Sequence, residues 1–151
     1  MSQLSLTGKD VLKINNRLLN DLADGDCVHI TLPNDSVAVK IGKEGNAVYA
    51  LNEQGRQTNV EIRALRGGAT DKQLNSLYAA QLADFASTIL INAEFIKRIG
   101  DGAGGVTNDT YIMGGGVIPK LPEATSNAEG NTDQSLAIWS IIFTNRQRAI
   151  G

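Results

Sequence analysis

The sequence contains one cysteine, one histidine and one tryptophan among its 151 residues. A single cysteine excludes an intramolecular disulfide and a zinc site that is built on several thiolates. It is also typical of a protein that is made in a reducing cytoplasm. Chemistry that depends on thiol pairs or on histidine clusters is therefore not expected, and we expect neither a metal nor a cofactor.

Strong charge of one sign and long hydrophobic runs are also missing. The formal net charge is -2, which gives no electrostatic basis for tight binding to nucleic acid or to a membrane surface. The apolar runs are too short to cross a bilayer, and the first residues lack a basic start followed by an apolar stretch. We therefore expect no secretory signal and no membrane insertion by this chain.

What is present suffices for one folded domain over residues 1–151. Hydrophobic residues make up 42% and charged residues 20% of the chain, which is enough apolar material for a core. Short alternating segments predict a mainly β domain. Asn15-Asn16 and Asp24-Gly25 are typical of tight hairpin turns. Strands are predicted over residues 11–14, 17–22, 27–32, 58–64, 89–99, 110–113, 117–121 and 135–144.

One segment has helical periodicity instead. Thr70 followed by Gln73 fits a capping box with Thr70 as the N-cap, and the pattern predicts a helix over about residues 71–86. Its apolar stripe is expected to pack in the core and comprises Leu74, Leu77, Tyr78, Leu82 and Phe85. The predicted fold is an antiparallel β-sandwich or barrel-like domain with one flanking α-helix and a long protruding loop, about residues 33–46.

The protruding loop is too long to be a simple connection. Val37, Val39 and Ile41 alternate within otherwise polar residues, so three branched apolar side chains lie on one edge. A flexible hairpin tip is one interpretation. The other is a contact between subunits, because a solvated loop gains little from apolar side chains unless a neighbour covers them.

Two motifs resemble functional sites. Residues 100–105 match GxGxxG, but the following residues are typical of a strand, whereas dinucleotide binding requires a helix there. A hairpin turn is therefore predicted. Cys27 and His29 are expected to share one face of a strand. Ordinary strand residues explain them best. The alternative is a small β-domain hydrolase or binding module, which would be a monomer with a concave pocket that depends on Cys27.

The order and spacing of several segments resemble the tail tube proteins of contractile-tailed bacteriophages. The resemblance covers most of the chain. The segments that carry it are LTGKDV at 6–11, LADGD at 22–26, LPND at 32–35, ALNEQGRQ at 50–57, RIGDG at 98–102, GGVIPK at 115–120 and EA at 123–124.

The resemblance implies a structural subunit without enzymatic activity. Such proteins form hexameric rings by joining their sheets edge to edge, and the rings stack into a tube inside a sheath through which DNA passes. Expected partners are further copies of the chain, the tail sheath, tape-measure, baseplate initiator and tail terminator proteins, and DNA in transient, non-specific passage. The expected location is the virion tail, assembled in the host cytoplasm. The loop then supplies candidate inter-ring contacts: Pro33, Asn34, Asp35, Val37, Val39, Ile41 and Lys43.

The predicted strand over residues 89–99 has one mostly apolar face, expected to lie in the core, and one mixed face. Glu94 and Arg98 on the mixed face are candidates for lining the lumen, where Glu94 would form an acidic ring that repels phosphate. The alternative within the same class is a secreted inner-tube protein of a contractile injection system or a bacteriocin.

Overall fold

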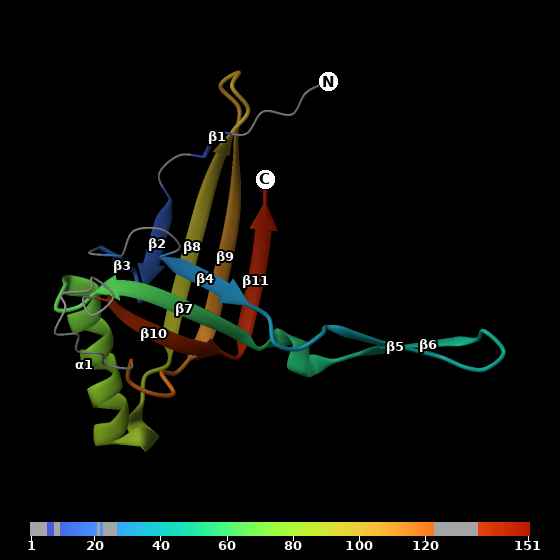
Figure 1. The fold of residues 1–151 in the computed structure, drawn as a ribbon, viewed down its shortest axis with the longest axis horizontal. Helices are drawn as coiled ribbons and strands as arrows, with labels where there is room; N and C mark the ends of the chain where they lie inside the picture. Colours follow the sequence, from blue (N-terminus) through green and yellow to red (C-terminus); the bar gives the residue numbers. More distant parts are fainter. Residues whose placement is uncertain (1–5, 8–9, 21, 23–26, 123–135) are drawn as a thin grey trace, which may run out of the picture.

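The computed structural model describes residues 6–7, 10–20, 22, 27–122 and 136–151 (Figure 1). The predicted hairpin signal Asp24-Gly25 lies outside these residues. The elements in chain order are β1 Leu6–Thr7, β2 Val11–Ile14, β3 Arg17–Leu18, β4 Val28–Thr31, β5 Val37–Ile41, β6 Ala47–Leu51, η1 Glu53–Arg56, β7 Thr58–Leu65, α1 Ala69–Ala83, η2 Phe85–Ser87, β8 Ile91–Gly100, β9 Val106–Gly116, β10 Leu136–Phe143 and β11 Asn145–Ile150.

The strands form two packed sheets and a separate hairpin. Sheet A has the order β11-β9-β8-β2-β3, with β1 also paired to β8. Sheet B has the order β10-β7-β4, and β5 pairs only with β6. All pairings are antiparallel. Figure 1 shows sheet B crossing sheet A, α1 at one side and the β5–β6 hairpin extending from the other. The mainly β fold with one flanking helix is as the sequence predicts.

The core lies between the two sheets. Strand β7 buries every second residue, so Val60, Ile62 and Ala64 face inward while Glu61 is exposed. Strand β8 likewise buries Ile91, Ala93 and Phe95, as predicted, whereas Ile89 of the predicted strand precedes β8 and is 87% exposed. The largest core side chain is Trp139 of β10, whose indole N–H donates to the Asp71 carboxylate at 2.8 Å. That hydrogen bond satisfies the buried polar group and joins α1 to sheet B.

Both predicted turns with special backbone geometry are confirmed. Asn15 and Asn16 have φ of 51° and 62°, the left-handed conformation that a two-residue hairpin between β2 and β3 requires. The glycine-rich segment is the β8–β9 turn. There the Asp101 carboxylate accepts hydrogen bonds from the backbone N–H groups of Ala103 and Gly105, which lower the pKa of Asp101. A strand follows this turn, so the segment lacks the helix of a dinucleotide site.

The helix starts earlier than predicted, and its capping box is wrong. Gly68 is the N-cap, and Thr70 lies inside the first turn. The buried Thr70 hydroxyl instead donates to the Asn20 carbonyl oxygen and accepts from the Asn20 N–H. Thr70 therefore ties α1 to the segment after β3. The Asp71 carboxylate accepts a hydrogen bond from the Gly67 N–H at 2.9 Å and so stabilises the N-terminal end of the helix.

The predicted core stripe of the helix is only partly correct. Leu74 is fully buried, and Leu77 and Tyr78 are half-buried against the core. The helix ends at Ala83, before the predicted residue 86, and Phe85 lies beyond it in η2. Leu82 and Phe85 are 62% and 68% exposed, whereas Gln81 is the buried residue of the last turn and hydrogen-bonds the Ile118 backbone. The apolar stripe therefore does not coincide with the buried face at the end of the helix.

Other features also differ from the sequence prediction. The predicted protruding loop is a two-stranded hairpin, with only residues 42–46 as its turn. Strand β10 is apolar on both faces, yet Ile138 is 42% exposed. Strand β11 was not predicted at all. In the described residues no helix is long and apolar enough to span a membrane.

Candidate functional site

The strongest candidate site is the β5–β6 hairpin, called the arm here and defined as residues 37–51. Its register pairs Val37 with Leu51, Val39 with Tyr49 and Ile41 with Ala47. Because side chains alternate across a ribbon, these six residues share one face. We call this set the apolar face of the arm. The opposite face carries Ala38, Lys40, Val48 and Ala50.

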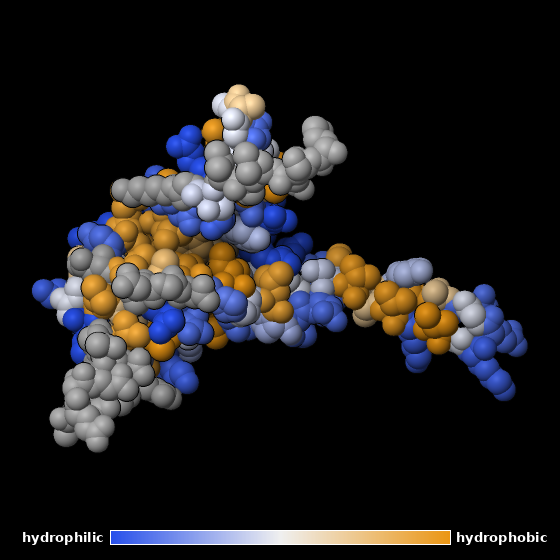
Figure 2. Space-filling model, turned by 45° about the horizontal axis from the view of Figure 1, so that its top comes forward, coloured by the Kyte–Doolittle hydropathy of each residue, from blue (hydrophilic) through white to orange (hydrophobic). Residues whose placement is uncertain are grey.

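The arm touches little of its own chain. Every residue from Val37 to Leu51 is exposed, and Tyr49 and Leu51 of the apolar face are each 72% exposed. Figure 2 shows apolar side chains along the arm and hydrophilic ones at its tip. A two-stranded ribbon with no supporting layer is only marginally stable in water. An apolar surface of this kind, held away from the body, indicates a surface that is covered by a partner.

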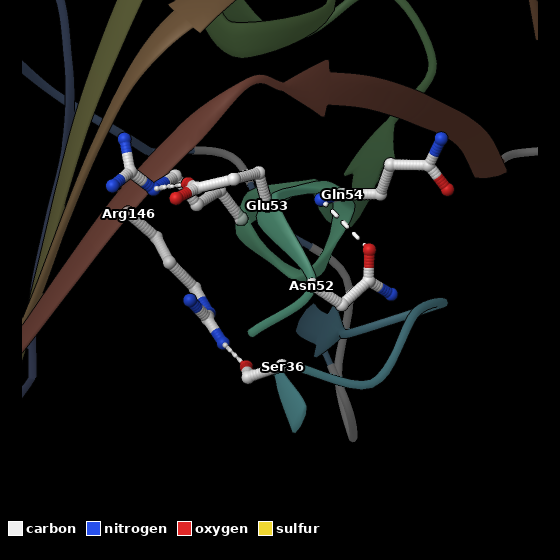
Figure 3. Close-up of polar contacts among 6 residues, drawn as sticks. Ser36, Asn52, Glu53, Gln54 and Arg146 are labelled. Carbon is white, nitrogen blue, oxygen red and sulfur yellow. Dashed lines mark hydrogen bonds and ion pairs between the residues drawn. The ribbon is translucent and has the colours of Figure 1, made fainter. Parts of the chain in front are cut away.

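The base of the arm is built by side-chain hydrogen bonds. Asn52 donates from its amide nitrogen to the Asp35 carbonyl oxygen at 2.8 Å and accepts from the Gln54 N–H at 3.2 Å. Its backbone N–H donates to the Ser36 carbonyl oxygen at 2.8 Å. Arg146 of β11 reaches Ser36 at 3.5 Å (Figure 3). The two strands of the arm are thus joined to each other and to the edge of sheet A where they leave the body.

Gly55 makes this base compact. A Cβ at Gly55 would lie 2.6 Å from the Ser36 Cα and 2.7 Å from the Asp35 carbonyl oxygen. These are backbone atoms, so a larger residue would have to displace the strand entering the arm. Only glycine at position 55 permits this close approach of the two backbone segments. In the same 3-10 turn, Glu53 and Arg56 form an exposed ion pair at 3.1 Å, also drawn in Figure 3.

The structure separates the predicted loop residues into two groups. Val37, Val39 and Ile41 lie on the apolar face of the arm, and Lys43 lies in its turn. Pro33, Asn34 and Asp35 belong to the base instead. Asn34 donates to the Gln54 carbonyl oxygen at 3.3 Å. The first group can contact a partner, whereas the second group determines the direction of the arm.

The other candidate residues lie on the outer face of sheet A, which no described element covers (Figure 1). Glu94 is half-buried there and Arg98 is exposed. Lys13 of β2 is the register partner of Glu94, so the two side chains are neighbours on the same face. With Lys13 beside it and Arg98 further along the same strand, Glu94 does not give this face an acidic character by itself.

Sheet A does not close on itself. Strand β11 is paired on one side only, by β9, and β3 pairs only with β2. Arg148 of β11 joins this edge strand to β9. Its guanidinium donates to both carboxylate oxygens of Asp109 at 2.8 and 3.1 Å and lies 5.5 Å from the centre of the Tyr111 ring. Arg148 lowers the pKa of Asp109, and Asp109 raises the pKa of Arg148. An ordered open edge can accept a strand of another chain.

Cys27 and His29 do not converge on one cleft. Cys27 lines a cleft of about 280 Å³ between sheet A and β4, together with Leu12, Ile30 and Phe95. His29 is exposed and does not line it, and its register partner is Glu61. The part of the chain that the structure describes contains no group of three or more histidine, cysteine or acidic residues placed to hold a metal.

The fold defines a class: a β-sandwich with one flanking helix and a projecting β-ribbon. No protein-family model and no curated protein matches the chain. Among the solved structures that match, two cover 95% of it. One is a chain of the sheath–tube complex of an extracellular contractile injection system, PVC, in the extended state, with a TM-score of 0.56, 10% identity and 88% of that chain covered. The other is a chain of the PVC sheath/tube terminator, with a TM-score of 0.54, 12% identity and 93% covered.

These likenesses concern the fold. Both matched chains come from the sheath–tube part of a contractile system, in agreement with the resemblance to contractile-tail tube proteins. The arm residues Tyr49 and Leu51 and the anchoring Arg146 were missed in the sequence. A second apolar run over residues 47–51, which pairs with 37–41, was the signal available for the arm. No comparable signal identified Arg146.

Proposed function

We propose that this chain is a structural subunit that assembles into stacked hexameric rings, forming the inner tube of a contractile tail. The observation that carries the proposal is the arm. Its apolar face is exposed, yet its base is fixed by Asn52, Gly55 and their backbone partners. A rigidly mounted apolar ribbon is suited to a partner that arrives in a defined position.

The open edges of sheet A support ring formation. Pairing the β11 edge of one copy with the opposite edge of the next extends the sheet around a ring and removes the exposed edges. The outer face of sheet A, with Lys13, Glu94 and Arg98, then lines the lumen. The arm lies apart from this sheet and is free to reach a neighbouring ring, a heterologous contact that repeats along the axis.

In its more specific form, the proposal is that the chain forms the tail tube of a phage, through which DNA leaves. Its partners would then be the sheath, tape-measure, baseplate initiator and terminator proteins. A second candidate is the inner tube of a contractile injection system or a bacteriocin, and the matched sheath–tube and terminator chains favour it. Neighbouring genes distinguish the two, because capsid genes accompany the first and secretion components accompany the second.

Electron microscopy of the concentrated protein tests the proposal. We expect rings or tubes, forming more readily when a baseplate initiator supplies a nucleus. Recovery of monomer alone, at high concentration and with sheath and initiator proteins present, would contradict it. A monomer that loses a ligand or an activity on Cys27→Ala would instead support the small hydrolase or binding module.

A further inference from the structure

A second apolar surface lies at the end of α1. It comprises Leu82, Phe85, Ile89 and Leu90, which are 62%, 68%, 87% and 49% exposed. We call this set the helix-end patch. Leu82 lies in the last turn of α1 next to the buried Gln81, and the other three residues follow the end of the helix. Four large apolar side chains in one short segment indicate a covered surface.

The arm and the helix-end patch are on opposite sides of the molecule. In Figure 1 the arm extends away from the sheets on one side, while α1 and η2 lie on the other. The two surfaces therefore do not meet within one chain. They can meet between two copies related head to tail, which is the geometry of a contact that repeats along an axis.

The charges of the two surfaces are complementary. The last turn of α1 contains no basic residue, and Asp84 follows it as the C-cap. The helix dipole and this carboxylate make the helix end negative. In the arm, Lys40 and Lys43 exceed the single acidic residue Glu44. None of these four charged side chains is in an ion pair within the described residues.

We propose that the arm of one copy docks its apolar face on the helix-end patch of another copy, with Lys43 at the tip close to Asp84. This rests on the proposed self-assembly and names the two surfaces that meet. It explains why a positive tip and an apolar ribbon are held away from the body, and why α1 ends in exposed apolar side chains. The partner is therefore a second copy of this chain rather than the sheath.

Disulfide trapping between two chains tests this contact. In a Cys27→Ser background, a Tyr49→Cys chain is mixed with a Leu82→Cys chain of different mass, assembled and mildly oxidised. We expect a mixed disulfide dimer. The matched controls are Val48→Cys, on the opposite face of the arm, and Lys72→Cys, in the first turn of α1. Each control should give several-fold less mixed dimer with the same partner.

A charge exchange gives an independent readout. Lys43→Asp should raise the protein concentration needed for assembly several-fold, and Asp84→Lys in the same chain should restore it. Rings or tubes that form without the Tyr49–Leu82 disulfide, or with equal control disulfides, would overturn the contact and leave the proposed function intact. Leu82→Ser that abolishes sheath binding but leaves tubes unchanged would also overturn it. Absence of any wild-type assembly would overturn the proposed function itself.

Discussion

Gly55 and Asn52 determine where the arm leaves the body. Asn52 links the two strands through one side chain and one backbone hydrogen bond, and Gly55 lets the entering strand pass at close range. Their surroundings contain no catalytic geometry. Their role is to hold the arm in a fixed direction. The entropic cost of ordering the arm is then not incurred when a partner binds.

We predict that Gly55→Ala lowers the free energy of unfolding by about 1–3 kcal/mol, because the new Cβ displaces the backbone at Asp35 and Ser36. Assembly should be impaired by more than this loss explains, because the arm changes direction. Denaturant unfolding and electron microscopy measure the two effects. The control is Gly42→Ala at the arm tip, where the new Cβ meets its nearest atom at 3.6 Å. Equal behaviour of both variants would contradict a role for the base.

The Asp109–Arg148 pair predicts a pH dependence. The pKa of Asp109 is lowered by Arg148, so the stabilisation is fully present above the ordinary carboxyl pKa. It is lost as the pH falls through the lowered pKa. Because Arg148 is half exposed, solvent screens the pair and its contribution to stability is small. Thermal unfolding at neutral pH should show Asp109→Asn less stable than wild type, and the difference should shrink in acid below about pH 4. A difference that grows in acid would contradict this sign.

At the scale of elements, α1 has a buried face and an exposed face. Leu74 is fully buried in the core formed by both sheets, and Gln81 near the helix end is buried with its side chain hydrogen-bonded to the Ile118 backbone, whereas the neighbouring Leu82 is exposed. Thr70 and Asp71 secure the beginning of the helix through Asn20 and Trp139. The buried face of α1 therefore stabilises the fold, and the exposed side chains at its end are available for assembly.

We predict that Leu74→Ala costs about 2–5 kcal/mol of unfolding free energy, because it leaves a cavity in the core. Leu82→Ala should change the stability of the monomer by less than about 0.5 kcal/mol, as is usual for exposed positions. Chemical denaturation of both monomers measures this. A large loss for Leu82→Ala would place that side chain in the core and exclude a free helix-end patch.

The arm is expected to be dispensable for folding. Replacing residues 39–49 by Asn-Gly joins the register pair Ala38 and Ala50 through a two-residue turn and keeps the base intact. The shortened chain should retain its monomer stability within about 1 kcal/mol, because loop length has little effect on stability. Tube formation should be lost, as electron microscopy would show. Long tubes from the shortened chain would refute the inter-ring role.

At the scale of the whole molecule, the fold leaves two kinds of surface unsatisfied. Among the described residues, the edges of sheet A lack strand partners. The apolar side chains of the arm and of the helix-end patch are exposed and lack an apolar surface that covers them. Edges favour lateral pairing, and head-to-tail surfaces favour stacking. A ring that stacks satisfies both, whereas a monomer satisfies neither.

The sequence predicted those features that depend on local chemistry. Alternation in β7 identified Val60 and Ile62 as core, and Asn15-Asn16 identified a hairpin turn. It failed where tertiary surroundings decide. Thr70 fits a capping box, but its hydroxyl bonds the Asn20 backbone instead, and Leu82 has helical spacing but is exposed, whereas the polar Gln81 beside it is buried.

The candidate site was predicted in part for the same reason. Three branched residues of β5 identified an apolar edge, so the arm was recognised as a contact surface. Its second strand was hidden, since Tyr49 and Leu51 acquire their meaning only from pairing with Val39 and Val37. The neutralising position of Lys13 beside Glu94 likewise follows from strand register, which the local sequence does not specify.

The most direct test of the account is cryo-electron microscopy of the purified chain assembled at high concentration with sheath and baseplate initiator proteins supplied. The account predicts sixfold rings that stack into a hollow tube, with the outer face of sheet A lining the lumen and the β5–β6 arm crossing between rings. A population of monomers only, or rings in which the arm stays in solvent, would contradict it.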